Sequence, residues 1–198
     1  PASSKIELYI ANTDDTAHTA DFYVTATEGA GIIYANPDAS SMFASLLKLE
    51  TINFTGCNFT LTENMKDMFN TCLSLKSVDF KFLKAPLLKN AEVMFMRCSD
   101  LVSVDMGNID FANTTSMRSM FNGCSKLTDV KFKKMNANSV KSTSDMFCDC
   151  SSLKTLDLSG LGLSDLSERA NMFSGCTSLE RVTFGANYVS PTTAGVEN

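Results

Sequence analysis

Cysteine is the residue type with the greatest capacity for chemistry in this chain, which has 198 residues, seven cysteines and one histidine. A thiol nucleophile needs a nearby base, and a metal site needs several thiols or imidazoles together. The single imidazole, His18, lies in a segment rich in Thr and Asp, where we expect an ordinary surface residue. The sequence therefore shows no catalytic group, metal site or cofactor motif, and it predicts a protein that is not an enzyme.

Five of the seven cysteines recur every 26 residues, and this regularity bears on the role of their thiols. They are Cys72, Cys98, Cys124, Cys150 and Cys176. We favour free thiols that fill small apolar positions of a core. Disulfides are a second interpretation, with Cys148 and a neighbouring periodic cysteine as the favoured pair, although equivalent side chains in stacked segments would point in parallel. A metal site at Cys148 and Cys150 is the weakest interpretation, because no second thiol pair or histidine accompanies them.

The cysteine period belongs to a repeat that covers most of the chain. The dipeptide Met-Phe recurs at intervals of 26 residues, starting at Met42, Met68, Met94, Met120, Met146 and Met172. A leucine follows each Met seven residues later, at Leu49, Leu75, Leu101, Leu127, Leu153 and Leu179. A fixed period indicates stacked units, each of which covers the apolar stripe of its neighbour. The sequence therefore predicts an α/β solenoid of six units, with Phe69, Phe95, Phe121 and Phe147 in a single row.

Each unit divides into two halves with different apolar periods. In the first half, Met117, Met120, Phe121 and Cys124 stand at i, i+3, i+4 and i+7, which is one apolar stripe of a short helix. In the second half, apolar and polar residues alternate, as in a strand with one buried face. We therefore expect a short helix and a parallel strand in every unit, with the strands at 49–54, 75–80, 101–106, 127–132, 153–158 and 179–184.

Two of the units, MFNGCSKLTDVKF from Met120 and MFSGCTSLERVTF from Met172, resemble the repeat of BspA-like leucine-rich-repeat surface proteins. The resemblance covers residues 42–184. It implies a leucine-rich-repeat right-handed superhelix, a bacterial cell-surface or secreted location, and a role in adhesion, including binding to host matrix proteins and to other cells. The motif residues of that family are structural, so the resemblance carries no functional site over to this chain.

The two ends of the chain are expected to differ from the repeats. Residues 1–41 are predicted to form an N-terminal β cap, residues 42–190 the solenoid of six units, and residues 191–198 a frayed tail. Neither an initiator Met nor a signal segment is found at Pro1–Ser4, so we expect a processed chain that lacks any signal or lipid anchor it once had. No apolar run approaches the ~20 residues needed to cross a bilayer.

The exposed side of the predicted strands is the extended surface on which a partner could bind. Its candidate binding residues are Asn53, Asp79, Lys81, Asp105, Lys131, Lys133 and Asp157. The net charge of −5 argues against a nucleic-acid or anionic-membrane partner. No tyrosine or arginine cluster is evident on this side to act as a hot spot. A merely solvated face is the competing interpretation.

The favoured hypothesis is a non-enzymatic binding module of the cell surface, an adhesin or host-interaction protein. Its strand side would bind a host or matrix protein, another cell-surface protein or a glycan. The alternative is a structural spacer or stalk that presents another domain of a larger surface protein.

Overall fold

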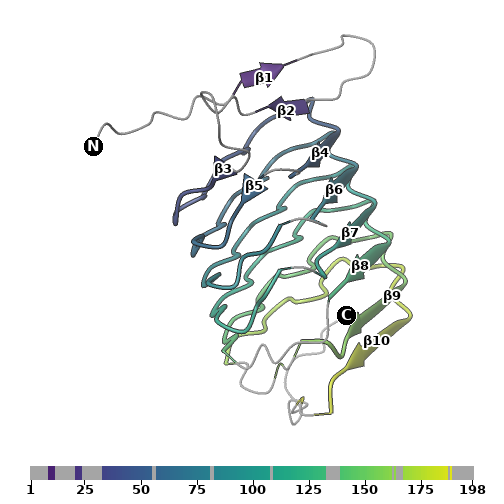
Figure 1. Cartoon of the computed structure of the whole chain (residues 1–198). Coiled ribbons are helices and arrows are strands. Elements are labelled where there is room, and N and C mark those ends of the chain that lie inside the picture. The colour runs from purple at the N-terminus through teal and green to yellow at the C-terminus, as the bar shows by residue number, and fades with distance from the viewer. Residues whose placement is uncertain are drawn as a thin grey trace.

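The computed structural model describes residues 9–11, 21–23, 33–54, 57–80, 83–107, 109–132, 139–161, 163, 167–186 and 188. Within these residues the regular elements are short β-strands (Figure 1). They are β1 (Tyr9–Ala11), β2 (Asp21–Tyr23), β3 (Ile33–Tyr34), β4 (Thr51–Asn53), β5 (Cys57–Asn58), β6 (Ser77–Asp79), β7 (Ser103–Asp105), β8 (Asp129–Lys131), β9 (Thr155–Leu158) and β10 (Arg181–Phe184). We number the repeats 1 to 6 by their Met-Phe dipeptides, so that β4 lies in repeat 1 and β10 in repeat 6.

Successive repeats stack with their strands in parallel. β4, β6, β7 and β8 form one sheet in that order, and β9 pairs with β10. Each step of the register is 26 residues, so Ile52 lies beside Val78, Val78 beside Val104, and Val104 beside Val130. The predicted parallel strands in repeat register are therefore confirmed, while the handedness of the superhelix stays a prediction.

The strands are shorter than predicted because tight turns enclose them. Leu75, at the start of one predicted strand, donates its N–H to the Cys72 carbonyl three residues earlier, at 3.1 Å. At the other end of a strand, Asp105 Oδ1 accepts the Gly107 N–H at 2.8 Å. Turns of these two kinds stop the chain from remaining extended. Only the three or four residues between them pair with the next repeat.

The predicted helices are wrong: the described residues contain no helix, and so none that could span a membrane. In the Met-Phe half of repeats 1 to 5, successive N–H groups alternate between two kinds of acceptor. The Asn70 N–H bonds to the Asp67 carbonyl of its own repeat, whereas the Phe69 N–H bonds to the Met94 carbonyl of the next repeat at 2.8 Å. Equivalent bonds to the following repeat come from the N–H groups of Phe43, Phe95, Phe121 and Phe147. We call this second set of inter-repeat bonds the Met-Phe ladder.

Backbone conformation explains why the helical spacing misleads. An α-helix needs a negative φ at every residue, but Asp67 and Thr71 have φ values of 59° and 64°. The equivalent residues of the other repeats are also left-handed, and two of them are glycines, Gly123 and Gly175. Left-handed residues at intervals of four interrupt any helix, yet they keep the apolar side chains at i, i+3, i+4 and i+7 buried. Spacing alone therefore cannot separate this ladder from a helix.

The core is a continuous apolar row that runs through the stack. Phe69, Phe95, Phe121 and Phe147 stack face to face, with successive ring centroids 5.2, 5.4 and 5.4 Å apart and interplanar angles of 8° or less. The predicted single row of phenylalanines is therefore confirmed. Stacked and edge contacts of this kind add to the free energy gained by burying the rings.

The two ends of the stack differ. At the N-terminal end, β1 pairs antiparallel with β2, β2 contacts β4, and β3 pairs in parallel with β5. In repeat 6, Phe173, Cys176 and Leu179 are only half-buried, whereas their equivalents in repeats 2 to 5 are buried. The domain boundaries at residues 41 and 190 stay predictions. His18 and the predicted tail at 191–198 lie outside the described residues.

Candidate functional site

The periodic cysteines form a ladder of thiol hydrogen bonds inside the stack. Each S–H donates to the backbone carbonyl of a phenylalanine 29 residues earlier, as Cys98 does to Phe69 and Cys124 does to Phe95, both at 3.1 Å. All seven cysteines are free. The structure therefore places four of the periodic cysteines in the core, as predicted, and the fifth, Cys176, is half-buried. Among the residues described, no three His, Cys, Asp or Glu side chains are grouped closely enough to hold a metal ion.

Burial makes these thiols unreactive. It raises the pKa of Cys72 to about 11 and the pKa of Cys124 well above its ordinary value. Cys148 lies outside the ladder and is half-buried; burial, and then the charge of Asp149, raise its pKa to about 11. Since the thiolate is the nucleophile, a thiol that stays protonated at neutral pH reacts slowly. The ladder cysteines therefore have a packing role.

The outward residues of β4 and β6 to β10 form a continuous polar surface, which we call the strand face. Along β6, Ser77 and Asp79 are exposed and the residue between them is buried, and β7 and β8 repeat this pattern. Four of the candidate binding residues are exposed on this face, namely Asp79, Asp105, Lys131 and Asp157. The side chain of Asn53, together with Lys81 and Lys133, lies outside the described residues. Their role in binding stays a prediction.

Two of the candidate carboxylates also hold the ends of strands. Asp105 Oδ1 accepts the Gly107 N–H, and Asp157 Oδ1 accepts the Ser159 N–H, each at 2.8 Å. Hydrogen bonds from the hydroxyl and the N–H of Ser159 keep the pKa of Asp157 below its ordinary value. Such local turns satisfy backbone groups where a strand ends. Asp105 and Asp157 thus have a structural role in addition to the binding role predicted for them.

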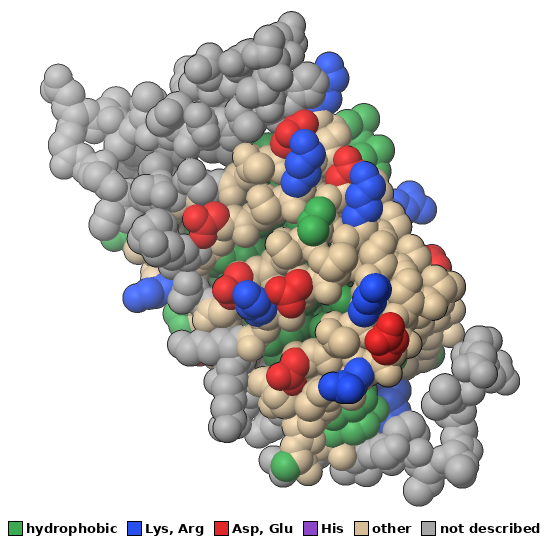
Figure 2. All heavy atoms as spheres, turned by 90° about the vertical axis from the view of Figure 1, so that its right-hand side faces the viewer, with side chains coloured by type: hydrophobic (Ala, Val, Ile, Leu, Met, Phe, Trp, Pro, Cys, Tyr) green, Lys and Arg blue, Asp and Glu red, His purple; other side chains and the backbone are tan. Residues whose placement is uncertain are grey.

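Positive and negative side chains are mixed over the strand face (Figure 2). Lys76 pairs with Glu50 of the preceding repeat at 2.7 Å, and Lys131 lies 3.8 Å from Asp129 on the same strand. Because neighbouring charges pair in this way, the described part of the face presents no large field of one sign. A strongly charged partner would not be steered toward it.

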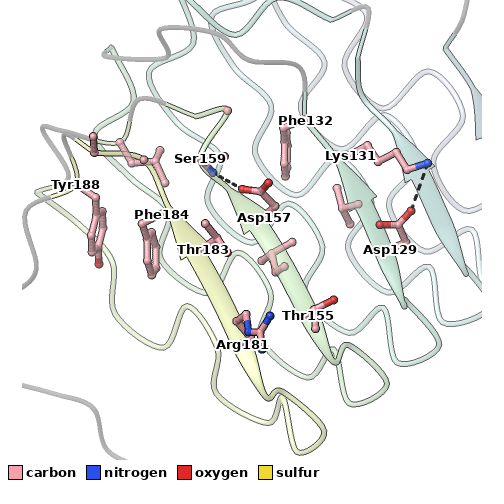
Figure 3. Close-up of a pocket in the computed structure, with 16 residues that line it drawn as sticks. Asp129, Lys131, Phe132, Thr155, Asp157, Ser159, Arg181, Thr183, Phe184 and Tyr188 are labelled. Carbon is pink, nitrogen blue, oxygen red and sulfur yellow. Dashed lines mark hydrogen bonds and ion pairs between the residues drawn. The ribbon is translucent and has the colours of Figure 1, made fainter.

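The strand sheet is interrupted between repeats 4 and 5. β8 and β9 are neighbours (Figures 1 and 3), but they belong to separate sheets, and no pairing joins these two described strands. The Met-Phe ladder between the same repeats is intact, because the Phe121 N–H still donates to the Met146 carbonyl at 2.8 Å. Where the structure describes these two repeats, the break between them thus lies on the strand side.

Phe132, which directly follows β8, shows that the core is accessible at this opening. Its equivalents in the two preceding repeats, Phe80 and Met106, are 2% and 0% exposed, whereas Phe132 is only half-buried. Its ring packs edge-on against Phe111, with centroids 6.2 Å apart. The opening thus brings an aromatic ring of the core within reach of the strand face.

A pocket of about 840 Å³ occupies the opening and extends over β9 and β10 (Figure 3). Outward residues of the three strands supply its polar lining, and residues at and beyond the strand ends supply its aromatic lining. Among them are Lys131, Phe132, Asp157, Arg181, Phe184 and Tyr188. The pocket therefore joins two of the candidate binding residues, Lys131 and Asp157, to a cluster of aromatic rings, while Asp79 and Asp105 lie outside it.

Repeat 6 adds an arginine and a tyrosine to the lining of this pocket, Arg181 and Tyr188. The Tyr188 N–H donates to the Gly185 carbonyl at 3.0 Å, and this turn places Tyr188 parallel to Phe184, with ring centroids 3.9 Å apart. Tyr188 lies beyond the last strand and outside the repeated columns, so periodicity does not reveal it. The sequence does point to the arginine, because repeat 6 has Arg181, a large cation, at the position that Ser77 has in repeat 2.

Two known families match the repeats of this chain. The chain matches the family described as BspA type Leucine rich repeat region (6 copies) over residues 39–137. Over residues 89–188 it also matches the family described as Mycoplasma protein of unknown function, DUF285. No curated protein and no solved structure gave a match. Each family match covers half of the chain, and both fall on the stacked repeats with their Met-Phe, cysteine and leucine columns, so the chain belongs to the BspA-type leucine-rich-repeat family.

Proposed function

We propose that this chain is a non-enzymatic binding module of the bacterial cell surface, or a secreted one, that acts as an adhesin or host-interaction protein. The observation that carries the proposal is the strand face, where exposed polar side chains recur at the spacing of the repeats. Membership of the BspA-type family supports a role in protein interaction.

The rigidity of the strand face supports its use in binding. The Met-Phe ladder and the row of phenylalanine rings join successive repeats, and strand pairing does so except between β8 and β9. A surface that is already ordered loses little conformational entropy when a partner binds. The strand face is therefore a preorganised array of side chains.

The shape of the face favours a macromolecule as the partner. Sites for small molecules are mostly concave and apolar, whereas most of this face is a polar sheet surface. Its partners would be a host or matrix protein, another cell-surface protein or a glycan. A partner that spans several repeats would gain many weak contacts at once.

Blocking the middle of the strand face tests this function. Ser77 and Ser103 are exposed outward residues of β6 and β7. The double variant Ser77→Arg, Ser103→Arg puts two bulky cations on the face and leaves the strand-end bonds of Asp105 intact. Binding of the whole chain to immobilised matrix proteins and to a panel of cell-surface glycans would be measured by surface plasmon resonance. We expect the variant to lose at least about tenfold in affinity, as residues at the centre of an interface do.

A matched control places the same substitution elsewhere. Ala170 and Ser174 are exposed residues in the Met-Phe half of repeat 6, away from the strand face. The double variant Ala170→Arg, Ser174→Arg adds the same charge away from the strand face, and it should bind as the wild type does. Equal loss in both variants, or in neither, would contradict the use of the strand face.

The spacer or stalk function is the second candidate, and one observation favours it. The apolar side chains of repeat 6, such as Phe173 and Leu179, are half-buried, as expected of a surface that could stack against another repeat. The parent gene tests this alternative. Many additional repeats or a large further domain would favour the spacer, whereas strand-face binding by the present chain alone would argue against it.

A further inference from the structure

We propose that the opening between β8 and β9 is the anchor site of the strand face and accepts an extended protein segment carrying an acidic and an aromatic side chain. The proposal rests on the proposed function, because it names the chemistry of a partner bound to the same face. It draws on the pocket of about 840 Å³, the break in strand pairing and the side chains around them.

Arg181 is the cation of this pocket that is left for a partner. Among the other charged lining residues, Asp129 and Lys131 pair at 3.8 Å. Asp157 accepts the Ser159 N–H and keeps its negative charge, so a partner carboxylate would have to lie at Arg181 and away from Asp157. Within the described residues, no carboxylate lies at ion-pair distance from the exposed Arg181 guanidinium. A guanidinium binds a carboxylate through two parallel hydrogen bonds. The partner should therefore contribute an Asp or Glu.

The other end of the pocket is aromatic. Phe184 and Tyr188 stack in parallel with centroids 3.9 Å apart, and both are half-buried, as is Phe132 on the far side of the opening (Figure 3). Rings that are half-exposed side by side offer apolar area and quadrupole contacts to another ring. The partner should therefore contribute a Phe, Tyr or Trp at this end.

The spacing of the two ends defines the motif. Arg181 and Phe184 are the first and last residues of β10, three residues apart. At ~3.3 Å per residue in a strand, their Cα atoms lie roughly 10 Å apart. Because side chains alternate, Arg181 lies on the outward side of β10 and Phe184 on the inward side. An extended partner covers roughly 10 Å in about three residues and must also reach around the strand end, so its acidic and aromatic side chains should stand at least about three positions apart.

The side chains around the opening favour a polypeptide over a glycan. Tyr, Phe and Arg are enriched at the centres of protein interfaces, and all three types line this pocket. A glycan ligand is the competing outcome of the test.

The test is selection of peptides on the intact chain. A phage-displayed library of random dodecapeptides is panned against the immobilised protein, and a peptide from the enriched set is synthesised for calorimetry. We expect an acidic and an aromatic residue at the predicted spacing. Arg181→Gln and Tyr188→Ala should each weaken binding by about tenfold or more. A glycan array is probed in parallel with the same proteins.

Matched controls use the same residue types outside the pocket. Arg118 is an exposed arginine that pairs with Asp145 at 4.0 Å, and Tyr34 is 54% exposed in β3. Arg118→Gln and Tyr34→Ala should change the affinity by less than about twofold. Equal unfolding temperatures of all four variants would show that they fold alike.

Three results would overturn the anchor site. The first is that panning on the wild type enriches peptides no more than panning on the double variant Arg181→Gln, Tyr188→Ala does. The second is that the enriched peptides bind both single pocket variants as tightly as they bind the wild type. The third is that glycans bind in a pocket-dependent way and peptides do not. The failure of this proposal is distinguishable from that of the proposed function. If Ser77→Arg, Ser103→Arg abolishes partner binding while the pocket variants do not affect it, the strand face stands and the anchor site is wrong.

Discussion

At the scale of single residues, the Met-Phe ladder depends on backbone conformations that most side chains avoid. Left-handed φ values occur twice in every repeat, four residues apart. Glycine, Asn and Asp adopt this conformation readily, and the chain uses Gly123, Gly175, Asp67 and Asn171 there. Val93, with φ of 50°, and Thr71, with φ of 64°, are the least suited, because a branched Cβ crowds the backbone.

Replacing that valine should stabilise the protein. Val93→Asn introduces the residue type that already stands at the equivalent position in Asn171. The substitution should raise the free energy of unfolding by about 1 kcal/mol, because it relieves left-handed strain. Urea denaturation measures the change. Val102→Asn, at an exposed valine whose φ is not positive, is the control and should give no gain. A Val93→Asn protein that unfolds at a lower urea concentration than the wild type would contradict the assignment of backbone strain to Val93.

The buried thiols predict a loss of stability in alkaline solution. The folded chain keeps Cys72 protonated up to its pKa of about 11, whereas the unfolded chain releases the proton near its ordinary value of 9.0. Stability is therefore fully present below about pH 9 and decreases as the pH rises toward 11. Cys72→Ser keeps a hydrogen-bond donor to the Phe43 carbonyl but cannot ionise. Denaturant curves should show that wild type loses more stability than this variant over that interval, and an equal loss would be evidence against a raised thiol pKa.

At the scale of the elements, the row of phenylalanine rings joins the repeats more directly than the strands do. Each inner ring has a stacked neighbour on both sides; Phe95, for example, lies between Phe69 and Phe121. The strand ladder stops between β8 and β9, but the ring row continues across this step through Phe121 and Phe147. The repeats therefore stay in register where the sheet does not.

Truncating rings along the row should show this dependence on neighbours. Phe95→Ala removes a fully buried ring with two stacked partners, and it should lower the free energy of unfolding by about 3–5 kcal/mol. Phe173→Ala removes a half-buried ring that stacks, among the described residues, on Phe147 alone, with centroids 6.0 Å apart, so it should lower the free energy of unfolding by clearly less. Thermal and urea unfolding of both variants measure the two costs. If both variants lost a similar free energy of unfolding, the ring of repeat 6 would be packed as tightly as the ring of repeat 3.

The strands and the core were predictable from the sequence, and the Met-Phe half was not. Alternation around Val78 and Val104 fits only a strand with one buried face, so both the position and the register follow from it. The spacing of Met117, Met120, Phe121 and Cys124 fits a helix and the observed ladder equally well. What decides between them is hydrogen bonding to the next repeat, which a local apolar pattern does not encode.

The candidate site was predictable only in part, for a related reason. Lys131 and Asp157 sit in the repeated outward column and could be identified from it. The opening between β8 and β9 breaks the repeat rule, and Tyr188 lies outside the columns altogether. Periodicity identifies what the repeats share, so features that distinguish one repeat from the others need the structure.

At the scale of the whole molecule, the stack should be most stable in its middle. In repeat architectures each unit contacts only its neighbours, so stability is a sum of nearest-neighbour terms. The Phe, Cys and Leu columns are buried in repeats 2 to 5, whereas they are half-buried in repeat 6. The strand side is also weakened where β8 and β9 do not pair.

Native-state hydrogen exchange should reveal this gradient. The N–H groups of Phe69, Phe95 and Phe121 donate to the next repeat at 2.8 Å and should exchange slowest. The equivalent N–H groups of Asn171 and Phe173 have no acceptor among the described residues and should exchange at least about tenfold faster. NMR or mass spectrometry resolves these amides. Uniform protection across all six repeats would indicate that the stack opens as one unit.

The direction of the Met-Phe ladder has an electrical consequence. Every bond in it runs from an N–H of one repeat to a carbonyl of the following repeat, as from Phe43 to Met68 and from Phe147 to Met172. The peptide dipoles of these rows are therefore aligned along the axis of the stack, as they are in an α-helix. Their partial charges cancel inside and remain at the two extremities, negative beside repeat 1 and positive beside repeat 6. The Met-Phe ladder thus contributes a polarity along the stack that side-chain charges do not create. Other rows oppose it, because N–H groups such as those of Lys76 and Val102 donate to the preceding repeat.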